Sequence, residues 1–170
     1  MSQGRKKIVI LIVMLLCVGC DQASKAIATH VLFDGREVKV LGDMVRLQYS
    51  ENTGAMMGIG GNLPEETRFW LFTVLTGAAL VGIMAYLVKG KGLRPIDIAA
   101  FSLIAGGGAS NLADRLLKGG VVIDFILVTI GDFRTNIFNI ADALVVCGLL
   151  LLGLANMPWF VSPSGESDRH

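Results

Sequence analysis

The hydrophobic positions of this chain gather into long runs that polar residues interrupt at only a few places. A helix needs roughly 20 mostly apolar residues to cross a bilayer. Residues 69–88 contain no charged side chain, and residues 96–113 contain only Asp97, close to the start. Residues 138–159 are apolar except for Asn139 and Asp142 near one end and Asn156 near the other. These three runs each predict a membrane-spanning helix.

The first hydrophobic run, from Ile8 to Cys20, is too short to span a bilayer by itself. It reaches the required length only if the helix continues to residue 29, through Asp21 and Lys25. These two charges are spaced i, i+4 with the acid first, which is the favourable order for an ion pair within a helix. We therefore predict a first spanning helix over residues 8–29. The fold class is then an all-α polytopic membrane protein with four helices, and residues 1–170 form a single domain.

The same run also has a second interpretation. A basic start, a short apolar core and a small residue before Cys20 resemble a bacterial lipoprotein signal peptide, in which Cys20 would become the lipid-bearing first residue. A cleaved chain is expected to turn polar and rich in Gly and Ser after the cysteine, whereas the apolar pattern here continues to Phe33. We therefore favour a first helix that is not cut.

The segments between the helices carry their own signals. In the first outer loop, residues 30–68, the stretch 38–49 has alternating apolar and polar positions with a Gly-Asp turn. This pattern predicts a short β-hairpin lying on the membrane. A second outer loop covers residues 114–137. The polar tail at residues 162–170 is expected to be disordered.

Composition and charge place the chain in a membrane and give it an orientation. It is 53% hydrophobic and 17% charged, which excludes an ordinary soluble domain. The net charge of +1 comes without a clustered basic face, so no nucleic-acid partner is expected. Residues 5–7 and 89–94 hold Lys and Arg but no acid, and the positive-inside rule therefore places them and both termini in the cytoplasm.

Two acids lie inside apolar segments, where ionisable groups are costly and therefore functional candidates. Asp142 shares a helix face with Asn139, three residues before it, and Asp124 lies in the middle of the apolar stretch 121–128, which reads as a strand or an interfacial segment. Taken singly, each is explained as well by a structural hydrogen bond. Two carboxyl groups held close together in a low-dielectric pocket share a proton, so one can activate a water while the other acts as an acid.

Other hydrolytic chemistries find little support in the sequence. His30 and His170 are isolated, and neither G-x-S-x-G nor H-E-x-x-H occurs. The cysteines at positions 17, 20 and 147 form no metal-ligand pattern, and we expect packed free thiols. The sequence therefore predicts neither a metal nor a cofactor.

The third apolar run ends in a glycine stretch and a polar face. Glycines 106–108 predict the close approach of a neighbouring helix. Asn111, Asp114 and Arg115 follow at spacings that place them on one face at the outer boundary. An internal ion pair would account for Asp114. Arg115 could instead bind a substrate backbone or a lipid head group.

Five short blocks, read in order and spacing, resemble the lipoprotein signal peptidase family, also called signal peptidase II. They are DQASK at 21–25, NTGA at 52–55, NLADR at 111–115, VIDF at 122–125 and FNIAD at 138–142. Members of this family are four-helix aspartyl endopeptidases of the bacterial inner membrane. They remove the signal peptide from prolipoproteins after diacylglyceryl has been attached to the cysteine.

The resemblance implies roles for particular residues. Asp124 and Asp142 would be the catalytic pair, near the extracytoplasmic face, with diacylglyceryl-prolipoproteins as substrates and membrane lipid around the protein, which we expect to be a monomer. Two positions differ from the family pattern. Met56 and Met57 stand where the family commonly has a small residue and an aromatic residue after the NTGA block, and Ser110 stands where a glycine usually precedes Asn111. Residues expected to bind substrate or shape the site are Asn52, Gly54, Asn111, Asp114, Arg115, Asn139, Asp21 and Lys25.

Two rival functions remain at this point. A small transporter or proton channel would use Asp124 and Asp142 as relay sites, and would be favoured by ionisable groups at mid-membrane depth or on both sides. The sequence instead places its polar residues at one face. A lipoprotein lipidated at Cys20 would leave three later spanning segments unexplained.

Overall fold

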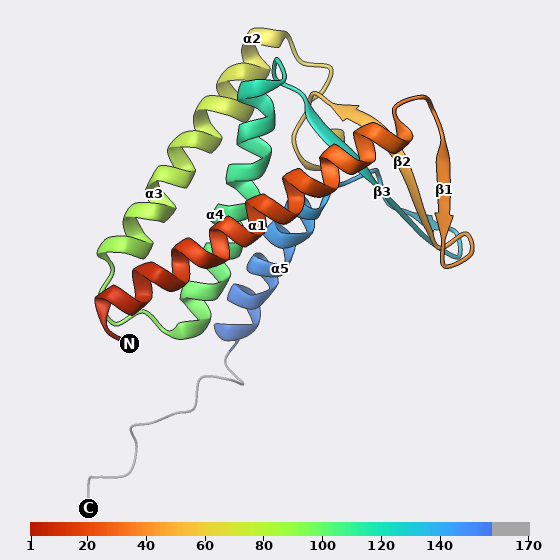
Figure 1. The fold of residues 1–170 in the computed structure, drawn as a ribbon. Helices are drawn as coiled ribbons and strands as arrows, with labels where there is room; N and C mark the ends of the chain where they lie inside the picture. The colour runs from red at the N-terminus through yellow and green to blue at the C-terminus, as the bar shows by residue number, and fades with distance from the viewer. Residues whose placement is uncertain (158–170) are drawn as a thin grey trace, which may run out of the picture.

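A computed structural model describes residues 1–157 of the chain. Figure 1 shows a bundle of helices with a small sheet beside one end of it, next to the C-terminal part of α1. In chain order the elements are α1 (Gln3–Leu32), β1 (Glu37–Val40), β2 (Val45–Asn52), the 3-10 turn η1 (Met56–Gly58), α2 (Glu65–Arg68), the π-helical turn η2 (Phe69–Val74), α3 (Leu75–Lys89), α4 (Pro95–Leu117), β3 (Val122–Ile130), β4 (Phe133–Arg134) and α5 (Ile140–Ala155).

Three helical stretches within residues 1–157 are long and apolar enough to cross a membrane: Gln3–Leu32, Glu65–Lys89 and Pro95–Leu117. They confirm the first three predicted helices, and each extends beyond the predicted bounds. α2, η2 and α3 follow one another directly and make up the second stretch. Most of the extra length comes from polar residues at the helix ends, which hydropathy alone does not assign to a helix.

The fourth predicted span, residues 138–159, forms a shorter helix than expected. α5 has 16 residues, fewer than the roughly 20 that a straight span needs. Phe138 is not helical, because it forms a β-bridge with Ile126, and Asn139 is the N-cap of the helix. Residues 158 and 159 lie outside the described part, as does the tail predicted to be disordered.

The sheet is larger than the single predicted hairpin. β1 and β2 form that hairpin around the turn at Gly42, whose φ of 68° suits glycine. The second outer loop then adds β3 and β4, giving a four-stranded antiparallel sheet in the order β1-β2-β3-β4. Ser50 of β2 lies opposite Asp124 of β3. The prediction of a helical protein with one small hairpin therefore holds for the helices and for β1 and β2, and the structure enlarges the hairpin to a four-stranded sheet.

Close helix contacts on α4 depend on glycine, as predicted. A Cβ atom at Gly106 would lie 2.6 Å from Cys17 Cβ of α1, and one at Gly107 would overlap the carbonyl oxygen of Ala141 in α5. Across the same helix pair, a Cβ at Gly148 would lie 2.7 Å from the carbonyl oxygen of Ala100. The first turn of α5 is therefore pressed directly onto the backbone of α4.

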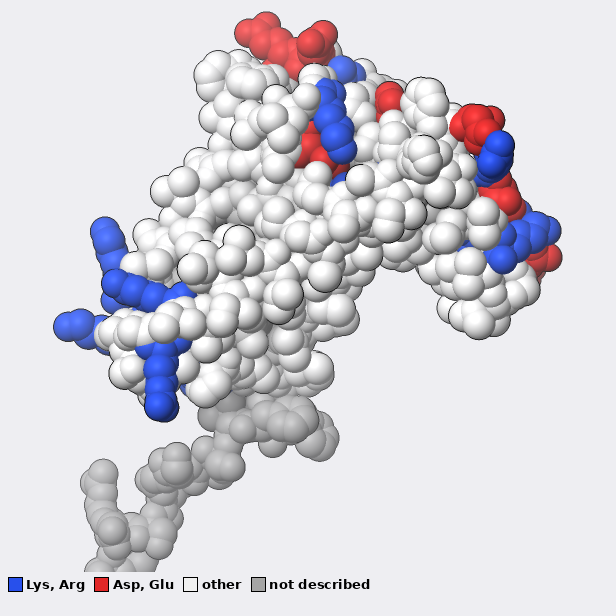
Figure 2. All heavy atoms as spheres, in the orientation of Figure 1, with Lys and Arg blue, Asp and Glu red and all other residues white. Residues whose placement is uncertain are grey.

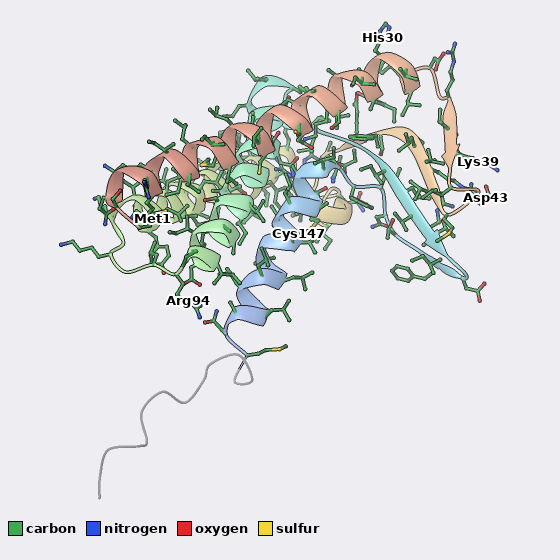
Figure 3. The ribbon with its side chains drawn as sticks, turned by 60° about the horizontal axis from the view of Figure 1, so that its bottom comes forward. Met1, His30, Lys39, Asp43, Arg94 and Cys147 are labelled. Atoms are coloured by element: carbon green, nitrogen blue, oxygen red, sulfur yellow. The ribbon has the colours of Figure 1, made fainter. Side chains whose placement is uncertain are left out.

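Charged side chains are segregated along the molecule. On the face shown in Figure 2, only basic side chains cluster at the end of the bundle that holds the N-terminus, while acids and basic side chains together lie at the opposite end and over the sheet. Figure 3 shows Met1 and Arg94 at the basic end, and Lys39 and Asp43 at the sheet. Between them the surface is largely uncharged. This distribution is typical of a protein that crosses a membrane several times.

The cysteines are free, as expected, but only Cys17 is buried. Cys20 and Cys147 are exposed, so the prediction that all three pack inside is wrong for these two. Both belong to apolar helices, where a small apolar thiol is tolerated on an outer face as readily as in the core.

Candidate active site

Asp124 and Asp142 meet where the sheet joins the bundle. Asp124 is the third residue of β3, and Asp142 lies in the first turn of α5. Only 1% of Asp124 and 7% of Asp142 is exposed. Asn139 connects the two acids, because its Nδ2 donates to Asp124 Oδ1 at 2.7 Å and its Oδ1 accepts from the backbone N–H of Asp142 at 2.9 Å. The fold therefore brings together the two carboxyl groups that the sequence singled out.

Every oxygen of the two carboxyl groups accepts a hydrogen bond. Asp124 receives Nδ2 of Asn139 on Oδ1 and Nδ2 of Asn52 on Oδ2, the latter at 2.9 Å. Asp142 receives Nδ2 of Asn111 on Oδ1 at 2.8 Å and the backbone N–H of Asn139 on Oδ2 at 3.3 Å. Such donors favour the ionised form of a carboxyl group. They offset part of the cost of burying the pair.

The orientation of each asparagine amide is fixed by a group that can only donate. Asn52 Oδ1 accepts from the backbone N–H of Gly54 at 2.8 Å, and Asn139 Oδ1 accepts from that of Asp142. Asn111 Oδ1 accepts from Nζ of Lys25 at 2.8 Å. Because N–H and ammonium groups have no acceptor, each amide must turn its NH₂ group toward an aspartate.

Burial perturbs the protonation of Asp124. It raises the pKa of this carboxyl group from 3.8 to about 6, the hydrogen bond from Asn52 lowers it, and the nearby charge of Asp142 raises it further. A carboxyl group with a pKa near 6 is available in both forms close to neutral pH. The pair can therefore hold one proton and one negative charge, as acid–base chemistry by two carboxyl groups requires.

A buried ion cluster lies behind the aspartates. Nζ of Lys25 is 2.7 Å from Asp21 Oδ2, the predicted i, i+4 pair, and 2.8 Å from Asp114 Oδ2. Asp21 Oδ1 also accepts from the backbone N–H of Ala141 at 2.8 Å, which ties α1 to the start of α5. Asp114 therefore forms an internal ion pair, one of the alternatives that the sequence left open for it. Ser110 fits this cluster, because its Oγ donates to Asp21 at 2.7 Å.

Arg115 and Gly54 shape the loop that follows β2. Nη2 of Arg115 donates to the carbonyl oxygen of Gly54 at 2.8 Å. A Cβ atom at Gly54 would lie 2.6 Å from the carbonyl oxygen of Ile59, so only glycine fits this fold of the loop. Nε of Arg115 is buried and has no hydrogen-bond partner within residues 1–157. The guanidinium group therefore has a buried N–H that no described residue satisfies.

A cavity of about 490 Å³ opens next to Asp124, and a second of about 310 Å³ lies by Arg68, Phe72 and Arg115. Thr53 lines both, so the loop after β2 lies between them. The first cavity is largely polar, with contributions from β2 and the segment after β4. Several of its residues were not predicted from the sequence: Gln48, Ser50, Glu51, Arg134 and Thr135. Alternation along β2 places Gln48 and Ser50 on the Asn52 face, and this signal could have found them.

Within residues 1–157, no three His, Cys, Asp or Glu side chains are grouped so that they could hold a metal ion. His30, on the last turn of α1, points away from the rest of the molecule in Figure 3.

The sequence matches the family described as signal peptidase (SPase) II over residues 13–157. A lipoprotein signal peptidase of Chlorobium luteolum is 31% identical over 165 residues, which cover 92% of this chain and 94% of that protein. The lipoprotein signal peptidase of Bacillus subtilis strain 168 is 32% identical over 141 residues, covering 82% and 87%. The similarity therefore extends over nearly the whole of both relatives.

Solved structures agree with the sequence match. One bacterial membrane enzyme superimposes with a TM-score of 0.79 at 26% identity, covering 95% of this chain and 94% of that chain. A second superimposes with a TM-score of 0.76 at 28% identity, covering 88% and 93%. Because the family match covers most of the sequence and the fold agrees, this chain belongs to the signal peptidase II family.

Proposed function

We propose that this protein is an aspartic endopeptidase that cleaves the signal peptide of diacylglyceryl-modified prolipoproteins just before the lipidated cysteine. The observation that carries the proposal is the buried pair of Asp124 and Asp142, linked through Asn139. Family membership supplies the substrate class. The raised pKa of Asp124 supplies the means of sharing one proton between two carboxyl groups.

In the proposed reaction, the ionised carboxylate removes a proton from a water molecule whose oxygen attacks the carbonyl carbon of the scissile peptide bond. The protonated carboxyl group donates a hydrogen bond to the carbonyl oxygen as charge develops there. When the tetrahedral intermediate collapses, the carbon–nitrogen bond breaks and a proton passes from the pair to the departing amine of the cysteine. The pair thus returns to its singly protonated state.

Arg115 and Asn52 are proposed to hold the substrate near the scissile bond. Arg115 has an unpartnered Nε beside the loop, and an arginine can donate to a peptide carbonyl with several N–H groups in a fixed geometry. Asn52 borders both Asp124 and the polar cavity of about 490 Å³. An apolar signal peptide would reach the pair from the membrane side, with the polar cavity next to Asp124.

We further propose that α5 is the fourth span, that both termini face the cytoplasm, and that the aspartates work near the extracytoplasmic face of the inner membrane. Support comes from the basic cluster at the N-terminal end of the bundle. The sheet and the aspartates belong to the opposite end. The proposed working form is a monomer surrounded by membrane lipid.

The direct test is incubation of the purified protein with a diacylglyceryl-modified prolipoprotein and with the same prolipoprotein unlipidated. We expect cleavage of the first only, and mass spectrometry should show a product that begins at the modified cysteine. A D124N preparation controls for contaminating proteases. Equal cleavage of both substrates, or cleavage at another bond, would contradict the proposal.

A further inference from the structure

We propose that Lys25 is a positioning residue for the aspartate pair: its ammonium group fixes the side-chain amide of Asn111 so that the NH₂ group faces Asp142. Nζ of Lys25 lies 2.8 Å from Asn111 Oδ1, and Asn111 Nδ2 lies 2.8 Å from Asp142 Oδ1. Lys25 acts through another residue and does not contact the carboxyl group itself. The activity readout of this inference rests on the proposed function.

Asn111 differs from the other two asparagines in what fixes it. Asn52 and Asn139 are held by backbone N–H groups, which side-chain substitution does not remove. Asn111 is held by a side chain, Lys25. A second donor, Asn139 Nδ2, reaches Asn111 Oδ1 at 3.1 Å, but the same nitrogen makes its shortest contact, 2.7 Å, with Asp124. The lysine is therefore the principal determinant of this amide's orientation.

The residues around Lys25 fix the directions of the three hydrogen bonds that its ammonium group donates. It is 1% exposed, and its three N–H groups face three acceptors within 2.8 Å: Asp21, Asp114 and Asn111. An ammonium group has three donors and no acceptor, so all of its hydrogen-bonding capacity is used. The two acids therefore direct the remaining N–H group at Asn111.

Removal of Lys25 would free the amide of Asn111 to turn over. Asn111 Oδ1 would then face Asp142 and favour its protonated form, so the pair would reach its singly protonated state only at higher pH. Charged groups near the pair from the other elements stay in place. These are Arg115 and Asp114 on α4, Asp21 on α1 and the two aspartates themselves.

A loss of positive charge would act in the same direction as a turned amide, and two variants separate the effects. Lys118 also contacts Asp114, at 2.8 Å, but makes no contact with Asn111, so K118M removes a neighbouring charge alone. The double variant K25M/D21N removes one charge of each sign and keeps the net charge of the cluster. N111D keeps an acceptor for Lys25 but loses the donor to Asp142, so it tests the same link with the lysine in place.

The experiment measures kcat and KM against pH with a diacylglyceryl-modified prolipoprotein. We expect K25M, K25M/D21N and N111D each to lose about 10²-fold in kcat, the order that misplacement of a reacting group costs, with KM nearly unchanged. The acidic limb of kcat should move to higher pH in the two Lys25 variants. K118M should match the wild type in kcat and in pH profile.

A second readout does not depend on cleavage. The infrared carbonyl band of the protonated carboxyl groups, followed during titration, should disappear at higher pH in K25M/D21N than in the wild type. Wild-type kcat and profile in N111D, or recovery of both in K25M/D21N, would overturn the positioning role. A wild-type protein that cleaves no prolipoprotein would refute the proposed function instead, and the infrared titration would still decide the role of Lys25.

Discussion

Asn139 and Asp142 form a reciprocal capping box at the start of α5. The side chain of Asn139 accepts from the backbone N–H of Asp142 at 2.9 Å, and the side chain of Asp142 accepts from that of Asn139 at 3.3 Å. The box satisfies two N–H groups of the first helical turn and holds the carboxyl group at the positive end of the helix dipole. The capping box that begins α5 therefore also positions Asp142, one of the two acids.

Replacement of either acid by its amide should abolish cleavage. D124N and D142N keep the size of the side chain but remove the ionisable group, which typically costs about 10²- to 10⁴-fold in rate. Because the pair is proposed to act as a unit, the double variant should be little worse than either single one. Cleavage assays on folded, detergent-purified protein measure this. Chelators should have no effect; near-normal turnover by either single variant would disprove the two-carboxyl mechanism.

The raised pKa of Asp124 predicts a pH dependence of stability. A carboxyl group whose pKa is higher in the folded than in the unfolded state stabilises the fold below its unfolded value, and this contribution is lost as the pH rises through the folded value. The window is from 3.8 to about 6, and two pKa units correspond to roughly 3 kcal/mol. Thermal unfolding between pH 4.5 and 7.5 should show a shallower decline for D124N than for the wild type. Parallel curves would contradict the assignment.

The contact of α4 with α5 predicts unequal effects of two Gly→Ala changes. A Cβ atom at Gly107 would overlap the backbone of Ala141, so G107A should lower the free energy of unfolding by about 1–3 kcal/mol and displace the first turn of α5. At Gly77 the Cβ atom would lie 3.7 Å from Leu112 Cδ2, an ordinary contact, and G77A should be neutral or up to about 1 kcal/mol stabilising. Denaturation of both variants in the same detergent compares them. Equal stabilities would show that the helices can separate.

Lys6 holds the end of α3 at the basic end of the bundle. Its buried Nζ donates to the carbonyl oxygens of Gly90 at 2.6 Å and Val88 at 3.3 Å, which lie at the C-terminal end of that helix. K6M should destabilise the fold by about 1–3 kcal/mol, because charge-assisted hydrogen bonds to helix-end carbonyls are lost. K7M, at the neighbouring exposed position, is the matched control and should change stability by less than about 0.5 kcal/mol. A similar loss of stability in K6M and K7M would show that the positive charge matters and that the hydrogen bonds of Lys6 do not.

The proposed topology predicts where inserted reporters will be found. A reporter fused after Lys91 should lie in the cytoplasm, whereas reporters inserted at Gly42 or Gly119 should lie outside, because the basic segments stay on the cytoplasmic side. Reporter activities that depend on compartment measure this directly. A reporter on the outer side at residue 91 would invert the proposed placement of the aspartates.

Hydropathy predicted the helical stretches because burial in lipid demands long apolar runs, which are visible in a single segment of sequence. Hydropathy did not predict correctly where the helices begin and end. The apolar run that begins at Phe138 predicts a helix from that residue, yet Phe138 pairs with Ile126 in a β-bridge. The hairpin around Gly42 was found from local alternation, whereas β3 and β4 turned it into a four-stranded sheet through pairing with β2, a contact between distant segments.

The sequence by itself determined which chemistry was available: two acids in apolar surroundings, an i, i+4 pair of Asp21 and Lys25, and an i, i+3 pair of Asn139 and Asp142. These follow from residue type and local spacing, which act within a few residues. Only the tertiary structure decided that Lys25 faces Asn111 and that Asn52 reaches Asp124, since these contacts join segments 86 and 72 residues apart. Amide orientation and the raised pKa of Asp124 depend on such contacts and on burial, and both arise only when helices and sheet are packed together.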